Sequence, residues 1–166
     1  MADLLAKQAM TEVLYRYCRG MDRMDRDLAL SVWHEDGTAD YGQHYRGSGA
    51  GFVDWVWKSH EAFERHSHQI TNILIELVDE DHATSEAYDT AALRQRTDDG
   101  RVIDIISRGR YLDRWSRRDG RWAIDHRISM HDLATVVERR PEEADDGAST
   151  ARRDRDDPSY DFLAGW

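Results

Sequence analysis

Apolar residues near the start of the chain recur at steps of three and four positions, the spacing that places side chains on one face of an α-helix. The pattern predicts a helix over Leu4 to Met21. We expect this helix to end at Gly20, because glycine readily adopts the backbone conformations that close a helix. The apolar stripe consists of Leu5, Ala9, Met10, Val13, Leu14, Tyr17, Cys18 and Met21.

Two shorter helices and a brief strand are expected between this helix and residue 68. The first helix is predicted over Asp27 to Trp33, and the following His34 to Gly37 is typical of a turn. A short strand is expected over Thr38 to Tyr41. The glycine-rich stretch 47–51 lacks the lysine of a phosphate-binding P-loop, so we interpret it as a hinge before an amphipathic helix. The apolar face of that helix consists of Phe52, Val53, Val56, Trp57 and Phe63.

From His68 onward the apolar and polar residues alternate, which is the period of a β-strand. Asp-Gly pairs at 99–100 and 119–120 separate alternating runs, a strong signal for hairpin turns. Helices grouped before an antiparallel meander predict an α+β fold in which the helices cover one face of a curved sheet. The predicted strands cover His68 to Val78, Ala83 to Thr97, Arg101 to Trp115 and Arg121 to His131.

The 166 residues are enough for one hydrophobic core and too few for two comfortable domains. We expect a single domain over residues 1–137, followed by a tail over residues 138–166. Glu138 to Pro158 carries many charges of both signs and almost no large apolar side chain, so this part of the tail is expected to be mobile. The end of the tail is expected to dock on the domain or on a neighbouring subunit through Tyr160, Phe162, Leu163 and Trp166.

Composition narrows the expected partners and location. With 23 basic and 33 acidic residues the net charge is -10, which argues against nucleic acids and anionic membranes as partners. Cys18 is the single cysteine, so the chain forms no internal disulfide. The first residues lack the pattern of a secretory leader, and we expect a cytoplasmic protein. Because both faces of the strand predicted over Arg101 to Trp115 are partly apolar, we also expect a homodimer or homotrimer.

Asp22 and His68 are the first candidates for catalysis. A carboxylate that orients an imidazole can remove a proton from carbon, and the ordinary pKa of histidine suits proton transfer near neutral pH. If the first helix ends at Gly20, Asp22 lies on a turn and can fold back toward the opening that Tyr17 faces. The alternative is that Asp22 caps the next helix and Tyr17 fills the core.

His66 and His68 lie two positions apart and share one face of the predicted strand, so with a carboxylate they could bind a metal. The spacing specifies no clear third and fourth ligand. We therefore interpret His68 as a general base and His66 as a surface histidine, and expect neither a metal nor a cofactor.

Arg127 is a candidate cation for stabilising negative charge, but strand alternation places it on the face opposite Trp122, Ile124 and His126. If Trp122 faces the core, Arg127 does not. Either a bulge changes the phase after Ile124, as bulges often do beside active sites, or Arg127 is an exposed cation.

Five residues are candidate walls of a pocket for a flat apolar or aromatic substrate. For each of them, ordinary core packing is the alternative. They are Tyr15, Trp33, Trp55, Tyr88 and Met130.

Four segments, in this order and spacing, resemble the SnoaL-like group of the nuclear-transport-factor-like superfamily over residues 4–133. They are Leu14 to Asp25, Trp33 to Gly37, His68 to Asn72, and Asp119 to Trp122 with Arg127. The resemblance implies a cone-shaped α+β barrel, in which a strongly curved, mostly antiparallel sheet wraps around N-terminal helices and encloses an apolar pocket. Members of the superfamily include ketosteroid isomerase, scytalone dehydratase, polyketide cyclases and hexachlorocyclohexane dehydrochlorinase.

By this resemblance Asp22, His68 and Arg127 match the catalytic aspartate, histidine and arginine of the dehydrochlorinase. Tyr17 stands where that enzyme has a lysine, and a tyrosine five residues before the aspartate is similar to bile-acid dehydratase. The resemblance therefore implies a cofactor-independent lyase that eliminates water or a similar group from a small hydrophobic, aromatic or steroid-like substrate. In this reading His68 takes the proton, and Tyr17 with Arg127 stabilises an enolate or assists the leaving group.

Other functions of the same fold remain open at this point. The chain also resembles the non-catalytic small subunit of ring-hydroxylating dioxygenases, and a protein that only binds a small hydrophobic ligand is a further alternative. Isomerase and polyketide cyclase activities are the remaining ones. A full set of Tyr17, Asp22, His68 and Arg127 around one cavity favours an enzyme, because a scaffold has no need for a base, its orienting carboxylate and two polar donors.

Overall fold

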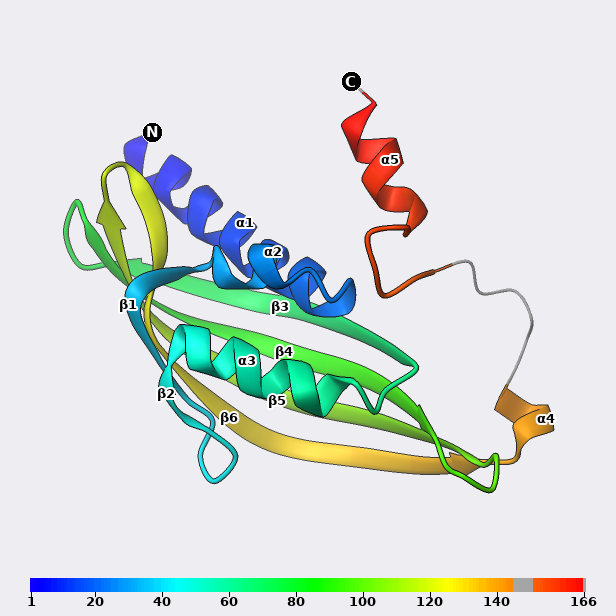
Figure 1. The fold of residues 1–166 in the computed structure, drawn as a ribbon. Coiled ribbons are helices and arrows are strands. Elements are labelled where there is room, and N and C mark those ends of the chain that lie inside the picture. The colour runs from blue at the N-terminus through cyan, green and yellow to red at the C-terminus, as the bar shows by residue number, and fades with distance from the viewer. Residues whose placement is uncertain (145–150, 166) are drawn as a thin grey trace.

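A six-stranded sheet curves around two long helices, α1 (Ala2–Asp22) and α3 (Gly49–His60), in the computed structural model, which describes residues 1–144 and 151–165 (Figure 1). The predicted α+β cone is confirmed. The other elements are α2 (Arg26–Leu30), β1 (Trp33–Asp40), β2 (Arg46–Ser48), β3 (Arg65–Leu77), β4 (His82–Arg96), β5 (Val102–Arg118), β6 (Arg121–Arg139), α4 (Pro141–Ala144) and α5 (Pro158–Ala164).

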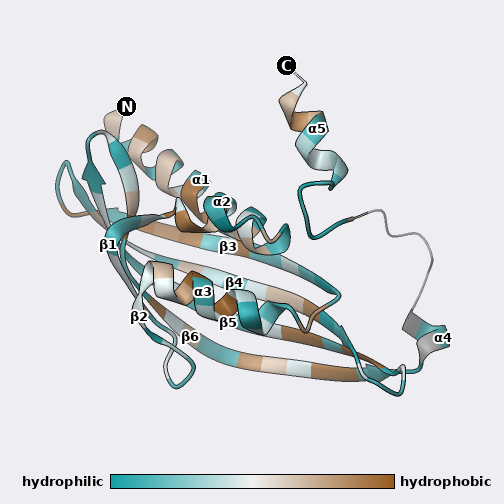
Figure 2. Ribbon diagram, viewed as in Figure 1, coloured by the Kyte–Doolittle hydropathy of each residue, from teal (hydrophilic) through white to brown (hydrophobic). Residues whose placement is uncertain are grey.

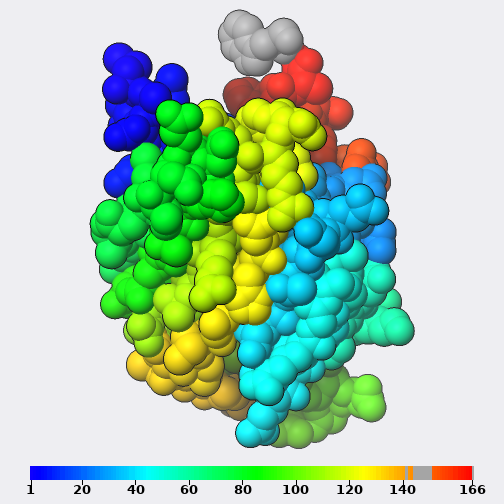
Figure 3. All heavy atoms as spheres, turned by 90° about the vertical axis from the view of Figure 1, so that its left-hand side faces the viewer, coloured from blue at the N-terminus to red at the C-terminus, as the bar shows by residue number. Residues whose placement is uncertain are grey.

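The strand order is β2-β1-β6-β5-β4-β3. Strands β3 to β6 pair in antiparallel fashion with their chain neighbours, which confirms the predicted meander. Strand β1 pairs in parallel with β6, and the short β2 pairs with β1 in antiparallel fashion. Figure 3 shows this strand order from the side, with β6 in yellow lying between β5 and the blue to cyan β1.

The first helix does not end at Gly20. It continues to Asp22, and the prediction of a stop at the glycine is wrong. A Cβ atom at position 20 would lie only 2.8 Å from the backbone nitrogen of Ala29. Glycine is therefore needed here for close approach of α2 to α1, not for a turn of the chain.

The region after α1 also differs from its prediction. Helix α2 has five residues, and the Asp25 side chain caps it by accepting a hydrogen bond from the Leu28 backbone N–H at 3.2 Å. Trp33 begins β1, so the expected turn over 34–37 lies inside a strand. The pairing of β1 with β6 shifts register between Trp33 and Thr38. Because of this irregularity the segment lacks the strict period of two that identifies a strand from sequence.

The core lies between the two long helices and the concave face of the sheet. Figure 2 shows brown, apolar residues on α1 and α3 and along the strands that they cover. The largest side chains that are fully buried are Trp115, Arg127, Tyr17, Phe52, Met10, Leu14, Met21 and Ile124. An arginine within this set is unusual, because a buried charge needs a partner.

The end of the chain is docked in part by its charged residues. Asp25 accepts hydrogen bonds from Arg155 at 3.0 Å and from Tyr160 at 2.8 Å, and Asp157 is 5% exposed. In residues 151–158 these polar contacts take the place of apolar ones, and the expected mobility of Glu138 to Pro158 stays a prediction. Of the expected apolar anchors, Tyr160 is half-buried, whereas Phe162 and Leu163 are exposed. Residues 145–150 and Trp166 of the predicted tail lie outside the described residues.

Apolar side chains also remain on the convex face of the sheet. Tyr88, Ile106, Met130 and Leu133 are exposed there. The expected homodimer or homotrimer stays a prediction.

Among the described residues, no helix is both long and apolar enough to span a bilayer.

Candidate functional site

A cavity of about 530 Å³ lies between the two long helices and the sheet. Twelve of its 20 lining residues are apolar or aromatic, and the other eight are four histidines, three serines and one aspartate from different elements. The helices and the loops after β1 and α3 contribute Tyr17, Met21, Tyr41, His44, Phe52, Trp55, Val56, Ser59, His60 and Phe63. The strands contribute His68, Asp89, Ala91, Leu93, Ile105, Ser107, Tyr111, Ser129, His131 and Ala134. A concave, mainly apolar site with several polar groups is typical of small-molecule binding.

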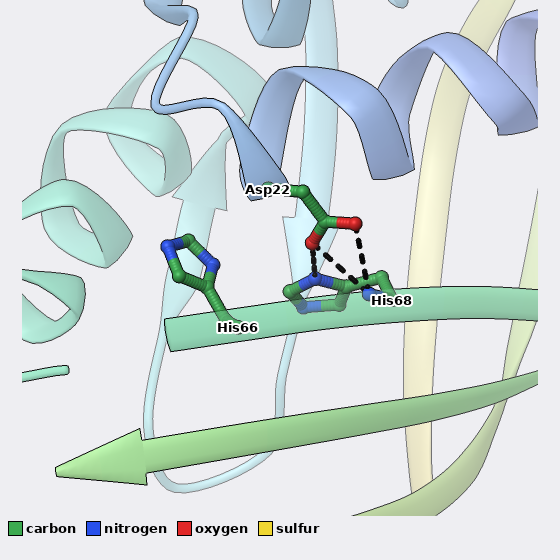
Figure 4. A group of neighbouring side chains, drawn as sticks. All are labelled: Asp22, His66 and His68. Carbon is green, nitrogen blue, oxygen red and sulfur yellow. Dashed lines mark hydrogen bonds and ion pairs between the residues drawn. The ribbon is translucent and has the colours of Figure 1, made fainter. Parts of the chain in front are cut away.

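Asp22 and His68 form a close pair (Figure 4), and His68 lines the cavity. The Asp22 carboxylate lies 2.7 Å from His68 Nδ1 and also accepts the His68 backbone N–H at 3.0 Å with each of its oxygens. Since the carboxylate is an acceptor, Nδ1 carries the ring proton and Nε2 keeps its lone pair. The pair can therefore accept a proton from a substrate at Nε2.

Tyr17 and Tyr41 supply hydroxyl groups to the cavity, with their oxygen atoms 3.2 Å apart. Burial raises the pKa of Tyr41 to about 12 and raises the pKa of Tyr17 well above its ordinary value. Both phenols therefore remain protonated at neutral pH, and one of the two can donate a hydrogen bond to a bound oxygen atom.

Arg127 is fully buried. A bulge after Ile124, one of the two alternatives considered from the sequence, changes the face of β6 on which the following side chains lie. Trp115 pairs with Ile124 and Arg114 with His126, so Asp125 is the extra residue of β6. Arg127 then faces inward and donates two hydrogen bonds of 2.7 Å to Asp113, the residue opposite it on β5. The alternative of an exposed cation is wrong.

The buried arginine stands behind the cavity wall. Its guanidinium lies 4.6 Å from the centre of the Tyr17 ring and 4.0 Å from that of Tyr111, and it is not itself part of the cavity lining. Burial alone would lower the pKa of Arg127, but the paired Asp113 carboxylate raises it, so the side chain remains charged. The Tyr17 and Tyr111 rings therefore stand between the Arg127 guanidinium and the cavity, in cation–π contact with it.

Asp89 is a site residue that the sequence reasoning missed. It lines the cavity from β4, and burial raises the pKa of its carboxyl group. Its Oδ1 atom is buried without a hydrogen-bond partner among the described residues. Strand alternation offered the signal, because Asp89 shares its face with Ala91 and Leu93, which also line the cavity. Tyr88, chosen for its aromatic ring, lies on the opposite face.

Two further histidines, His60 and His66, lie next to the pair formed by Asp22 and His68. His60 lines the cavity, and His66 lies behind it, with ring centres 4.8 Å apart. The expectation of a surface position for His66 is wrong, since this side chain is buried. Burial lowers the pKa of His60 to about 3 and that of His66 to about 2, so both rings are neutral near pH 7. Both ring nitrogens of His66 lack a hydrogen-bond partner among the described residues.

The five predicted pocket walls have different positions. Trp55 lines the cavity. Trp33 is buried and packs edge-on against Phe52, outside the lining. The prediction is wrong for Tyr15, Tyr88 and Met130, which are exposed: the first lies on the solvent side of α1, and the other two lie on the convex side of the sheet.

Comparison with known proteins supports the fold. A sequence profile of the SnoaL-like domain matches residues 2–128, whereas no curated protein matches the chain. A proposed scytalone dehydratase from Novosphingobium aromaticivorans has a TM-score of 0.72 at 21% identity, covering 81% of this chain and 89% of its own. A type 2 hexachlorocyclohexane dehydrochlorinase, LinA, has a TM-score of 0.72 at 16% identity, covering 82% of this chain and 91% of its own.

A third structure matches nearly the whole chain. This protein of unknown function from Mycobacterium tuberculosis has a TM-score of 0.64 at 20% identity, covering 98% of this chain and 86% of its own. At such identities the likenesses show the fold alone. With the domain profile covering most of the residues that build the cone and its cavity, the chain belongs to the SnoaL-like family.

Proposed function

We propose that this protein is a cofactor-independent lyase, which removes a proton from carbon and expels a small leaving group such as water. The observation that carries the proposal is the contact of 2.7 Å between Asp22 and His68 Nδ1, on a ring that lines an apolar cavity. An oriented imidazole with a free nitrogen, placed beside a mainly apolar cavity, is a suitable base for an acidic C–H bond.

The reaction can be written with its protons balanced. His68 Nε2 takes a proton from the carbon next to a carbonyl group, and the electrons of the C–H bond form an enolate. Tyr17 or Tyr41 donates a hydrogen bond to the enolate oxygen. Collapse of the enolate breaks the bond to the hydroxyl on the β-carbon, which leaves as water after taking a proton from Asp89. Transfer of the proton from His68 back to Asp89 restores the site.

Asp89 fits the role of the acid because its environment differs from that of Asp22. Burial raises the pKa of Asp89, so its carboxyl group retains a proton at a higher pH than an exposed aspartate. Asp22 instead accepts three hydrogen bonds from His68, so its carboxylate is engaged in orienting that ring. Two carboxyl groups with such different surroundings can divide the acid and base functions of one site.

The cavity supports a mainly apolar, flat substrate. Its size of about 530 Å³ lies within the range of about 300–1,000 Å³ that is common for small-molecule sites. The aromatic part of its wall consists of Phe52, Trp55 and Tyr111. Polar contacts on the strand side come from Ser129 and His131. We therefore expect an aromatic or steroid-like compound with a β-hydroxy carbonyl group.

The test is a panel of β-hydroxy carbonyl compounds, including steroid-like ones, in which loss of water is followed by mass spectrometry and by the absorbance of the conjugated product. We expect turnover by the natural protein, and a loss of about 10²- to 10⁴-fold in His68→Ala, the usual contribution of a general base. His82→Ala is the matched control, because His82 is an exposed histidine that pairs with Asp79. Full activity of His68→Ala contradicts the proposal, and tight binding without turnover favours the ligand-binding alternative.

A further inference from the structure

We propose that Asp22, His66 and His68 form a binding site for a divalent transition-metal ion such as Zn²⁺. One potential ligand atom from each residue lies within 4.8 Å of those of the other two. Figure 4 shows both histidine rings on the same side of β3, next to the carboxylate at the end of α1. Two imidazoles and one carboxylate are a common ligand set for zinc and for related first-row metals.

The geometry requires little rearrangement. Three atoms no more than 4.8 Å apart share a point within about 2.8 Å of each, while bonds from zinc to nitrogen or oxygen are about 2.0–2.2 Å long. Each side chain therefore has to move by less than about 1 Å, a distance that a small rotation of the side chain covers. The histidines are two positions apart on one strand, so their relative placement is fixed by the pleat of β3.

His66 is the independent observation that points to a ligand. The residue is 7% exposed, and neither of its ring nitrogens has a hydrogen-bond partner among the described residues. Buried polar atoms are almost always paired, because an unpaired one forfeits its hydrogen bonds to water. Its nearest ring is His60, whose Nδ1 atom is also buried and unpartnered. A bound cation would satisfy one His66 nitrogen and explain why an imidazole occupies this buried position.

Three protein ligands leave at least one position of a tetrahedral ion open. Because His68 lines the cavity, that position is accessible to a water molecule or a ligand from the cavity side. The ion would use the same two groups as the proposed base. Zinc should therefore slow elimination, a consequence that rests on the proposed function, whereas metal binding itself does not.

The experiment measures binding directly, on the full chain without a histidine tag and stripped of metal. Isothermal titration with Zn²⁺ and visible absorption with Co²⁺ are compared between the natural protein, His66→Gln and the surface control His82→Gln. We expect one ion per chain, a tetrahedral Co²⁺ spectrum, and at least about 100-fold weaker binding in His66→Gln, above the range of about 10- to 100-fold for groups that only orient a ligand. His82→Gln should bind like the natural protein.

Two results overturn the site. One is the absence of saturable binding, and the other is equal affinity in the natural protein and His66→Gln, which indicates an adventitious ion only. Circular dichroism checks that His66→Gln is folded, and Asp22→Asn serves as a second variant that must also lose the metal. Since neither titration depends on turnover, failure of the lyase assay leaves this result unaffected.

Discussion

Asp22 determines which nitrogen of His68 carries the ring proton. In Asp22→Asn the side chain has one acceptor atom and one NH₂ group, and the His68 backbone N–H needs the acceptor. The NH₂ group then faces Nδ1 and favours the tautomer with the proton on Nε2, which cannot act as the base. We expect kcat/KM for elimination to fall by about 10²- to 10⁴-fold while the fold is kept.

A second His–Asp pair offers the control for this variant. Asp79 contacts His82 Nδ1 at 2.9 Å, on the surface and away from the cavity. Asp79→Asn should leave kcat/KM unchanged. Steady-state kinetics measure kcat/KM for both variants, and circular dichroism checks that each is folded. A kcat/KM for Asp22→Asn within about threefold of that of the natural protein would show that the carboxylate does not orient the base.

Arg127 and Asp113 should contribute to stability as a unit. Both side chains have no exposed surface, so removal of one charge leaves the other buried without its partner. We expect Asp113→Asn to lower the free energy of unfolding by about 3–5 kcal/mol, the usual cost of breaking a buried pair. The measurement is urea denaturation, with Asp132→Asn as control.

Asp132 pairs with Arg110 in a partly exposed setting, at 3.3 Å. Its substitution should cost about 1 kcal/mol or less, because water screens such pairs. If Asp113→Asn and Asp132→Asn lower the free energy of unfolding by similarly small amounts, the charge of Arg127 is compensated by groups other than Asp113.

At the scale of secondary-structure elements, Gly20 sets how closely α2 lies against α1. Alanine is favoured over glycine by about 0.8–1.0 kcal/mol within a helix, so propensity alone predicts stabilisation in Gly20→Ala. The added Cβ would instead lie 2.8 Å from the Ala29 nitrogen and 3.0 Å from its Cα. We expect the contact to dominate and the variant to lose about 1–3 kcal/mol in urea denaturation, the usual cost of overpacking.

Gly165→Ala is the comparison for this variant. A Cβ atom there would meet its nearest neighbour at 3.5 Å, an ordinary contact distance. The substitution should change the free energy of unfolding by less than about 0.5 kcal/mol. If Gly20→Ala instead raises the free energy of unfolding, α2 can move away from α1 without a loss of stability.

The long elements bounded by clear turn signals were predictable from the sequence, even where a strand contains an irregularity, and the shorter β1 was not. Alternation and Asp-Gly turns identified β3 to β6, and the three- and four-residue steps identified α1. Strand β1 was largely missed because its pairing with β6 shifts register. The inward position of Arg127 depends on the extra residue at Asp125, which sequence alone offers as one of two alternatives.

The same limit applies to the candidate site. Residue type together with the family resemblance selected Tyr17, Asp22 and His68, but the choice of pocket walls by aromatic character selected Tyr88. The adjacent Asp89 faces the cavity, and strand phase was the better guide. The grouping of Asp22 with His66 depends on contact between α1 and β3, residues more than 40 positions apart, which no local pattern encodes.

At the scale of the whole molecule, the C-terminal segment is held against α1 and α2 largely by polar contacts. Asp157 pairs with Arg23 at 3.3 Å and caps α5 by accepting the Ser159 backbone N–H at 3.0 Å. Figure 2 shows the stretch before α5 in teal, the colour of hydrophilic residues. Few apolar contacts hold this segment, so its local stability should be low and sensitive to single polar substitutions.

We expect Asp157→Ala to release this segment while the cone stays folded. Loss of a cap costs about 0.5–2 kcal/mol, so hydrogen-exchange protection over residues 152–164 should fall by about 2- to 30-fold. Protection in β4 and β5 should not change. Asp161→Ala, an exposed acid on α5, is the control, and equal protection in both variants would contradict an anchoring role for Asp157.

Docking of the same segment should depend on pH. Hydrogen bonds from the Arg152 backbone N–H and from Ser159 hold the pKa of Asp157 below its usual range. Burial would raise the pKa of Asp25, but the hydrogen bond from Tyr160 and the contact with Arg155 keep it below its usual value. Since both pKa values are lower in the docked state than in the free chain, docking is stabilised above about pH 3.9 and is lost as the pH falls through the docked-state values.

The measurement is hydrogen exchange over residues 152–164 between pH 7 and pH 2.5, corrected for the intrinsic exchange rate at each pH. Protection should be constant down to about pH 4 and then decrease before that of β4 and β5, because the two carboxylates bind protons more readily in the undocked segment while the apolar core is intact. Asp157→Ala should show weak protection with a smaller change across the same range. A segment that stays protected to pH 2.5 would have to be held by contacts other than these carboxylates, and Tyr160 against Arg19, 4.6 Å from ring centre to guanidinium carbon, would be the next to test.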